Sequence, residues 1–146
     1  MAKRIKIDQV EPNGYKAIFG LEKFIESTPL TNTHKDLIKI RASQINGCAF
    51  CIDMHTKEAR KAGETEQRIY ALNAWRDTPF FTEEERAILS LTEEVTLISN
   101  HVKDETYTEA ANLLGETYLA QVILAIITIN AWNRIGITTL LVPPQD

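Results

Sequence analysis

Apolar residues recur along this chain at the spacing of helices rather than of strands. After a turn at residues 12–14, apolar side chains stand at positions 15, 18, 19, 21, 24 and 25, and Pro29 closes the segment. A repeat of three to four residues places such side chains on one face of a helix. Hairpin dipeptides flanked by alternating strands are missing. The pattern therefore predicts an all-α fold.

Polar residues and glycines mark where the helices should begin and end. Thr33, followed three residues later by Asp36, resembles a capping box and predicts a helix start. That helix should break at Asn46-Gly47, because this pair readily takes positive φ. The next helix should begin near Cys48 and end at residue 63, a glycine typical of a helix C-terminus.

Similar signals divide the second half of the chain. Thr65 should cap a helix over residues 66–75, and Thr82 and Thr106 are each followed three residues later by a glutamate. The final segment, residues 118–135, is apolar on most of its circumference, which is typical of a buried helix. We expect it at the centre of the domain or in a subunit interface, with Gly136 and Pro143-Pro144 ending it.

Composition narrows the class of protein. The 146 residues suit one domain, residues 1–146, large enough to bury a core without disulfides or metals. The formal charge is −4 and no Lys/Arg cluster stands out, so nucleic acid and anionic membranes are not expected partners. The start has no apolar signal region, and the longest apolar run, residues 122–127, is too short to span a membrane. We expect a cytoplasmic protein, whose thiols stay reduced unless they are catalytic.

The only two cysteines, Cys48 and Cys51, stand two residues apart, and His55 follows four residues later. On a helix that turns about 100° per residue, Cys51 lies at roughly 300° and His55 at roughly 340° from Cys48. All three side chains therefore share one stripe. The two sulfur atoms can meet in the first turn of a helix, and His55 can approach Cys51.

The expected helix start should activate the thiols. Unpaired N–H groups and the helix dipole stabilise a thiolate there, and the thiolate is the nucleophile. A neutral His55 could accept the thiol proton and then hold the thiolate as an imidazolium. This combination favours redox chemistry at Cys48 and Cys51.

Other interpretations stay open at this point. A structural disulfide would close a very short loop and remove little chain entropy. A zinc site would have Cys48, Cys51 and His55 as ligands but would need a fourth, such as His34 or His101. The cysteines could also be ordinary buried thiols. The βαβ setting of a thioredoxin is absent, so the pair must belong to a helical fold.

Residues 37–65, LIKIRASQINGCAFCIDMHTKEARKAGET, resemble the signature of the carboxymuconolactone decarboxylase-like superfamily, and specifically its AhpD-like alkylhydroperoxidase branch. That signature reads S-Q-x-N-x-C-x-x-C-x-x-x-H with a downstream A-x-x-x-G. The segment INAWNRIGI, residues 129–137, is also similar to the last-helix motif of that family, through Asn130, Trp132, Asn133 and Arg134. The resemblance covers about residues 21–137.

The resemblance implies an AhpD-like helical domain that forms homo-oligomers, often trimers or hexamers, and reduces hydroperoxides. It assigns Cys51 as the peroxidatic cysteine, Cys48 as the resolving cysteine, and His55 as part of a proton relay. The position of the relay glutamate is taken by Asp36, one methylene shorter, and Phe50 stands where AhpD has a second histidine. No cofactor besides the dithiol is implied, and an external thiol must reduce the disulfide.

Three functional hypotheses follow from these residues. The first is a dithiol peroxidase or disulfide oxidoreductase, the second a non-catalytic redox-sensing oligomer, and the third a zinc-binding module. Phe50 and Met54 flank the active stripe and could wall a small apolar pocket for an organic peroxide. His34 is expected in solvent, His101 in a structural or exposed position, and Trp132 in the core or an interface.

Overall fold

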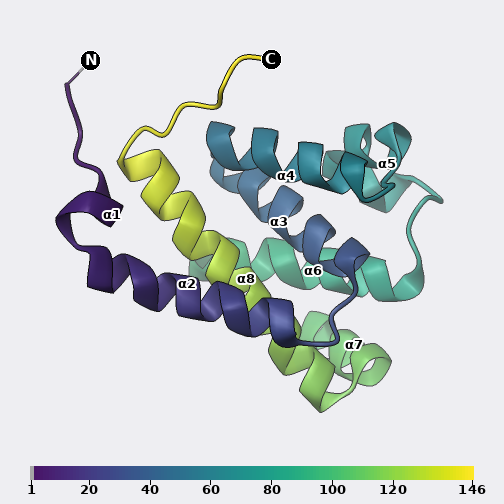
Figure 1. Cartoon of the computed structure of the whole chain (residues 1–146). Helices are drawn as coiled ribbons and strands as arrows, with labels where there is room; N and C mark the ends of the chain where they lie inside the picture. Colours follow the sequence, from purple (N-terminus) through teal and green to yellow (C-terminus); the bar gives the residue numbers. More distant parts are fainter. Residues whose placement is uncertain (1) are drawn as a thin grey trace.

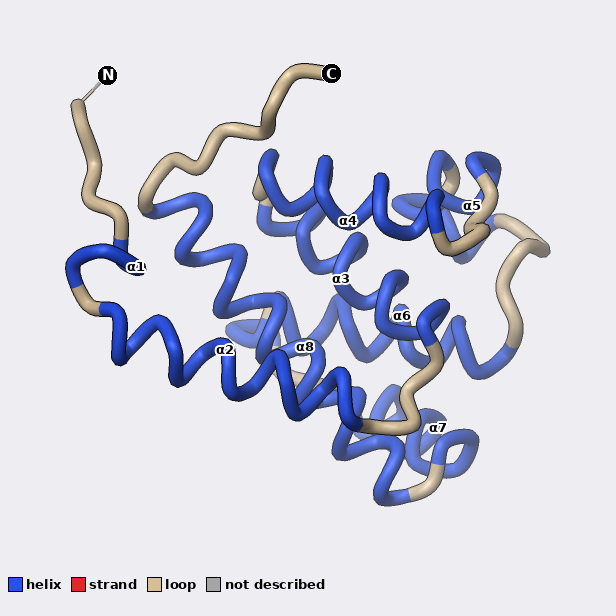
Figure 2. Tube along the Cα trace, in the orientation of Figure 1, coloured by secondary structure: helices blue, strands red, loops and turns tan. Residues whose placement is uncertain are grey.

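The computed structural model describes residues 2–146, which fold into helices joined by short loops, with no strand anywhere in that range (Figure 2). The predicted all-α class is confirmed. The elements, in chain order, are α1 (Ile7–Val10), α2 (Pro12–Ser27), α3 (Asn32–Asn46), α4 (Ala49–Lys61), α5 (Glu66–Tyr70), η1 (Leu72–Asp77), α6 (Glu83–Thr96), η2 (Ile98–Asn100), α7 (Asp104–Leu114) and α8 (Glu116–Thr138).

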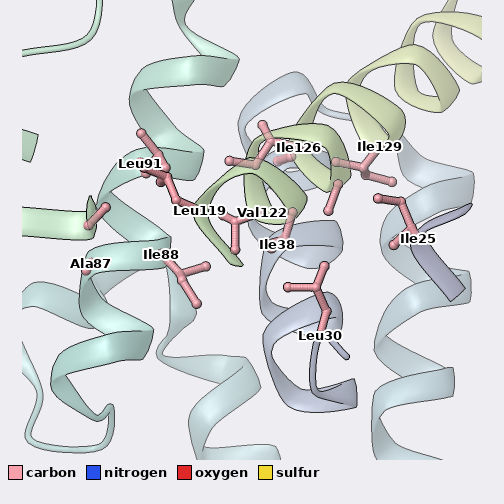
Figure 3. Packing of buried hydrophobic residues seen from close by; sticks show 13 residues of the cluster. Ile25, Leu30, Ile38, Ala87, Ile88, Leu91, Leu119, Val122, Ile126 and Ile129 are labelled. Carbon is pink, nitrogen blue, oxygen red and sulfur yellow. The ribbon is translucent and has the colours of Figure 1, made fainter. Parts of the chain in front are cut away.

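Helix α8 occupies the centre of the fold and contacts α2, α3, α4, α6 and α7 (Figure 1). Its residues Val122, Ile126 and Ile129 meet Ile38 of α3 and Ile88 of α6 in the main core (Figure 3). Burial of one such aliphatic side chain contributes about 1.5–3 kcal/mol. By length and apolar composition α8 could span a membrane, but these contacts make it the core helix of this fold.

The outward side of α8 is not covered within the chain. Ile127 is 45% exposed and Ile137 is 39% exposed, so the helix is not buried all round. A subunit interface could cover this exposed apolar side of α8, as the sequence analysis expected. The homo-oligomer stays a prediction.

A second core cluster holds α4 in place. Leu37 and Ile40 of α3 pack there with Ala59 of α4, and with Leu72 and Trp75 of η1. Helix α3 therefore has two buried faces, one toward α8 and one toward α4. This double burial fixes the α3–α4 turn, which carries the two cysteines, against the centre of the molecule.

Two helix starts follow the capping residues read from the sequence. The Glu85 N–H donates to Thr82 Oγ1 (3.1 Å) and the Thr82 N–H donates to Glu85 Oε2 (2.8 Å), so the predicted capping box is confirmed. Thr65 accepts a hydrogen bond from the Arg68 N–H (3.2 Å), as expected of a cap. The helix beyond it is shorter than predicted, since α5 ends at Tyr70 and a 3-10 helix, η1, follows.

The predicted cap at Thr33 is wrong. Helix α3 begins two residues earlier, with Thr31 accepting the His34 N–H (3.1 Å), because burial of the adjacent Leu30 draws the chain into the core before Thr33. His34 is consequently not in solvent: it is 8% exposed, with Nδ1 2.6 Å from the Tyr118 hydroxyl. Asp36 loses its expected capping role.

The predicted cap at Thr106 is also wrong. Helix α7 begins at Asp104, and its N-cap residue, Lys103, makes no side-chain capping bond. Glu94 accepts hydrogen bonds from the Lys103 N–H and from the Thr106 hydroxyl, both at 2.9 Å. The Thr106 hydroxyl thus bonds to a residue distant in sequence and does not cap a helix.

Gly136 does not end the last helix, which continues to Thr138. A glycine inside a helix costs about 0.5–1 kcal/mol relative to alanine, so packing must favour it there.

Candidate functional site

The turn between α3 and α4 is made by Asn46, Gly47 and Cys48. Gly47 has φ 73° and ψ 36°, the left-handed conformation that closes α3, and its N–H donates to Ser43 O (2.9 Å). Cys48 has extended backbone angles and is the N-cap of α4. The prediction that Asn46-Gly47 starts a new helix at the first cysteine is confirmed.

The two cysteines form a disulfide, with their Cα atoms 5.3 Å apart. Both are buried, Cys48 at 1% exposed and Cys51 at 3%. The backbone N–H of Cys51 donates to Cys48 Sγ at 3.4 Å. The amide that would stabilise a thiolate at the start of α4 therefore points at Cys48 rather than at Cys51.

The backbone of α8 covers the sulfur atoms at Gly136. A Cβ atom at this position would lie 3.0 Å from Cys48 Sγ and 3.6 Å from Cys51 Sγ. The absence of a side chain at Gly136 lets α8 approach the disulfide this closely, which gives a packing reason for a glycine inside the helix.

Asparagine side chains tie the turn to α8. The Asn46 amide donates to Asn130 Oδ1 and to Asn133 Oδ1, both at 2.9 Å. Asn133 is fully buried and donates from Nδ2 to Ser43 Oγ (3.0 Å). These bonds fix the end of α3 against α8. The sequence flagged Asn130 and Asn133 only as part of a motif, and the structure supplies this role.

His55 lies on α4, one helical turn beyond Cys51, and is 6% exposed. Its Nδ1 is 3.2 Å from Glu58 Oε2. Burial, helped by the positive charge of Lys39, lowers the pKa of His55, and Glu58 only partly opposes this shift. The imidazole is therefore neutral near pH 7 and can accept a proton. Glu58 was missed in the sequence, although its spacing from His55 is that of neighbours on a helix face.

Asp36 reaches the same region from α3. Burial raises the pKa of Asp36 to about 6, with the negative charge of Glu58 adding to the rise and Lys39 opposing it. Among residues 2–146 no hydrogen-bond or ion-pair partner of its carboxyl group is found. Asp36 is thus a carboxyl group that exchanges a proton close to neutral pH.

A cavity of about 890 Å³ brings the predicted site residues together, since Asp36, Cys51 and His55 all line it. Cys48 does not line it and lies behind Cys51. Phe50 and Met54 are also in its wall, as the helical stripe suggested. Of the residues assigned to the site, only Cys48 is screened from the cavity.

Aromatic side chains from α2 and α8 also line this cavity. Trp132 of α8 packs edge-on against Tyr15 and Phe19 of α2, with ring centroids 5.3 and 5.4 Å apart. Its Nε1–H donates to Glu22 Oε2 at 3.0 Å. Periodicity alone placed Trp132 in a core or an interface, because it cannot distinguish a cavity wall from either.

The zinc hypothesis finds no support in the side-chain geometry. Within the described range 2–146, no group of three or more His, Cys, Asp or Glu side chains is arranged to hold a metal ion. His101 is exposed, and His34 is engaged with Tyr118. Neither histidine therefore supplies the ligand that a site at Cys48 and Cys51 would need.

Comparison with known proteins gives consistent matches. The family model described as "Carboxymuconolactone decarboxylase family" matches residues 12–94. The uncharacterized protein YdfG of Bacillus subtilis is 47% identical over 138 residues, which is 94% of each chain. The crystal structure of ATU0492 from Agrobacterium tumefaciens, a protein of unknown function described as a candidate antioxidant defence protein AhpD, superposes with a TM-score of 0.95. It is 37% identical, and the match covers 99% of this chain and 100% of that one.

A more distant structure shares the fold. The debrominase Bmp8 gives a TM-score of 0.84 at 20% identity, with 93% of this chain and 74% of the other covered. At that identity the likeness concerns the arrangement of helices alone.

Proposed function

The chain belongs to the carboxymuconolactone decarboxylase family, and from that premise we propose that it is an AhpD-like dithiol peroxidase. In this proposal Cys51 and Cys48 reduce hydroperoxides, and His55 and Asp36 move the protons. One observation carries it: Cys51, His55 and Asp36 line one cavity, while Cys48 lies behind Cys51 at bonding distance.

The first step oxidises Cys51. Neutral His55 takes the Cys51 thiol proton, and the thiolate attacks the terminal oxygen of the hydroperoxide. The O–O bond breaks, the alkoxide leaves, and His55 returns the proton to form an alcohol. Cys51 is left as a sulfenic acid, and the peroxide has gained two electrons.

The second step forms the disulfide. The Cys48 thiolate attacks the Cys51 sulfur, the S–O bond breaks, and the hydroxyl leaves as water after it gains a proton. The Cys51 N–H that donates to Cys48 Sγ supports this role, because it stabilises a thiolate on Cys48 before the attack. An external pair of thiols then supplies two electrons and two protons to restore both cysteines.

In this proposal Asp36 supplies the protons. Its pKa of about 6 gives both protonation states a substantial population near neutral pH, and it shares the cavity with His55. It can therefore reprotonate or deprotonate the imidazole between steps, directly or through water. Phe50, in place of a second histidine, adds an apolar wall rather than another proton carrier.

The experiment follows the fate of each sulfur. Reduced wild-type protein should lose two thiols for each hydroperoxide converted to alcohol, and should turn over repeatedly with a thiol donor. The Cys48→Ser variant should accumulate a sulfenic acid on Cys51 that dimedone traps, whereas Cys51→Ser should form none. Full turnover by Cys51→Ser would overturn the assignment.

The same experiment distinguishes a peroxidase from the alternative, a non-catalytic redox sensor. A sensor would be oxidised once by one equivalent of peroxide and would show no turnover when a thiol donor is added. Sustained turnover, with alcohol produced in excess over protein, favours the peroxidase.

A further inference from the structure

The charged side chains around the cavity are out of balance. Five carboxyl groups and three lysines line it, which leaves a net of two negative charges when all are ionised. Asp36, with a pKa of about 6, is ionised at pH 8. A cleft lined mainly by one sign of charge repels ions of that sign and attracts the opposite sign.

The lysines deep in the cavity are already paired. Lys35 Nζ lies 3.2 Å from Glu26 Oε2, and Lys39 Nζ lies 3.3 Å from Glu22 Oε1 and 3.7 Å from Glu26 Oε1. Lys6, the third lysine, is exposed near the N-terminus. An incoming anion would have to break these pairs to bind Lys35 or Lys39.

Charges of both signs act on the end of the cavity near Cys51. Asp36 and Glu58 are the carboxyl groups there, since Glu58 lies against His55 and its charge raises the pKa of Asp36. Lys39 is the cation that acts on both Asp36 and His55, and it is already paired with Glu22 and Glu26. A carboxylate brought here would lose water beside two other carboxylates, which is unfavourable. The aromatic wall of Tyr15, Phe19 and Trp132 offers apolar surface to a neutral body instead.

We infer that access to Cys51 is selected by charge: the cavity admits uncharged or cationic hydroperoxides with an apolar body and excludes anionic ones. The identity of the substrate as a hydroperoxide rests on the proposed function, whereas the selection by charge rests on the side chains that line the cavity.

Alkylation of Cys51 tests the selection without any peroxide. Iodoacetamide and iodoacetate are nearly equal in size and differ by one negative charge. Reduced protein at pH 8 and low salt is treated with each, and mass spectrometry follows modification of Cys51. The rate ratio of amide to acetate should exceed that of the urea-unfolded chain by about tenfold or more. It should shrink toward the unfolded value in about 0.5 M salt. Equal ratios in folded and unfolded protein would overturn the inference.

A charge variant with a matched control locates the effect. Glu26→Gln removes the carboxylate that pairs with Lys35 and one of the two that pair with Lys39. The preference for the neutral reagent should therefore fall by about threefold. Glu109→Gln, on α7 and outside the cavity lining, changes the net charge equally and should leave the ratio as it is. An equal response of both variants would mean that overall charge, not the cavity, is responsible.

Three peroxides link the selection to the proposed reaction. Cumene hydroperoxide, its para-carboxylate derivative and the methyl ester of that derivative share one reacting group. The ester should be reduced with a kcat/KM about tenfold or more above that of the carboxylate. Equal values would leave the peroxidase standing and refute the charge selection. Selective alkylation without reduction of any of the three would refute the peroxidase and leave the charge selection standing.

Discussion

Two groups of polar side chains flank the α3–α4 turn, and they differ in how completely their hydrogen bonds are satisfied. On the α8 side, Asn46 donates to both Asn130 and Asn133, and Asn133 donates to the buried Ser43. On the cavity side, Asp36 has no partner among residues 2–146, and His55 has a single contact to a half-exposed Glu58.

This difference separates side chains that stabilise the fold from side chains that can take part in the reaction. A satisfied buried network stabilises one conformation, and the loss of any member leaves the others unpaired. Side chains with unsatisfied hydrogen-bonding atoms and shifted pKa values reduce the stability of the fold, but they can take up and release protons. We therefore expect substitutions on the two sides to divide between stability and turnover, and four predictions test this division.

The largest effect is expected from His55→Gln, on the cavity side. The variant keeps a polar side chain but loses the proton acceptor, so peroxidase turnover should fall by about 10²–10⁴-fold. The free energy of unfolding of the reduced protein should change by less than about 1 kcal/mol. Steady-state peroxide consumption and urea unfolding measure the two quantities. A large loss of stability with turnover retained would reverse the proposed division.

Asn133→Ala should act in the opposite way. It removes one acceptor of the Asn46 amide and the donor to Ser43 Oγ, although Asn46 keeps Asn130 and Ser43 keeps the Lys39 carbonyl. The free energy of unfolding should therefore fall by about 1–3 kcal/mol. Turnover per folded molecule should stay within a few-fold of wild type, because Asn133 does not line the cavity. Asn112→Ala, at an exposed position on α7, is the control and should change stability by less than about 0.5 kcal/mol.

Asp36→Asn should stabilise the protein in a pH-dependent way. The folded pKa of Asp36, about 6, lies above its unfolded value of 3.8, so the folded state binds the proton more tightly. Wild type therefore loses stability as pH rises from about 3.8 to 6, and the amide does not. Partial access to solvent reduces the effect, and we expect the variant to gain about 1–2 kcal/mol at pH 8 relative to pH 3.5, with lower turnover.

Unfolding of reduced wild type and Asp36→Asn across that pH range measures the gain. A stability difference that does not vary with pH would show that Asp36 is not held in a desolvated position.

The smallest effect is expected from Gly136→Ala, where the two sides meet. The added methyl group would crowd Cys48 Sγ at 3.0 Å, whereas alanine is the better helix residue. Crowding should weaken the disulfide relative to the dithiol by about 1 kcal/mol, or about fivefold in the redox equilibrium constant. Equilibration with a thiol–disulfide buffer measures this constant. An unchanged constant, with the reduced form more stable, would mean that α8 yields to the methyl group at no cost.

The local signals in the sequence explain which expectations held. Thr82 with Glu85 makes its cap from residues three apart, and Asn46-Gly47 makes its turn from neighbours, so neither depends on distant parts of the chain. The predicted cap at Thr33 failed because Thr31, beside the buried Leu30, caps α3 instead. The predicted cap at Thr106 failed because its hydroxyl donates to the distant Glu94. Local rules hold where no tertiary contact competes with them.

The sequence by itself determined that the protein is helical and that two thiols and an imidazole share one stripe of a helix. The evidence was the apolar periodicity, the Asn-Gly break and the spacing of Cys48, Cys51 and His55, because helix geometry alone relates residues a few positions apart. The tertiary structure decided which sulfur faces the cavity, that Gly136 lies against the disulfide, that Trp132 forms a wall and that carboxyl groups outnumber lysines around the cavity. Those properties arise where α2, α3, α4 and α8 meet, and the packing of residues far apart in sequence is set by the whole core rather than by any local pattern.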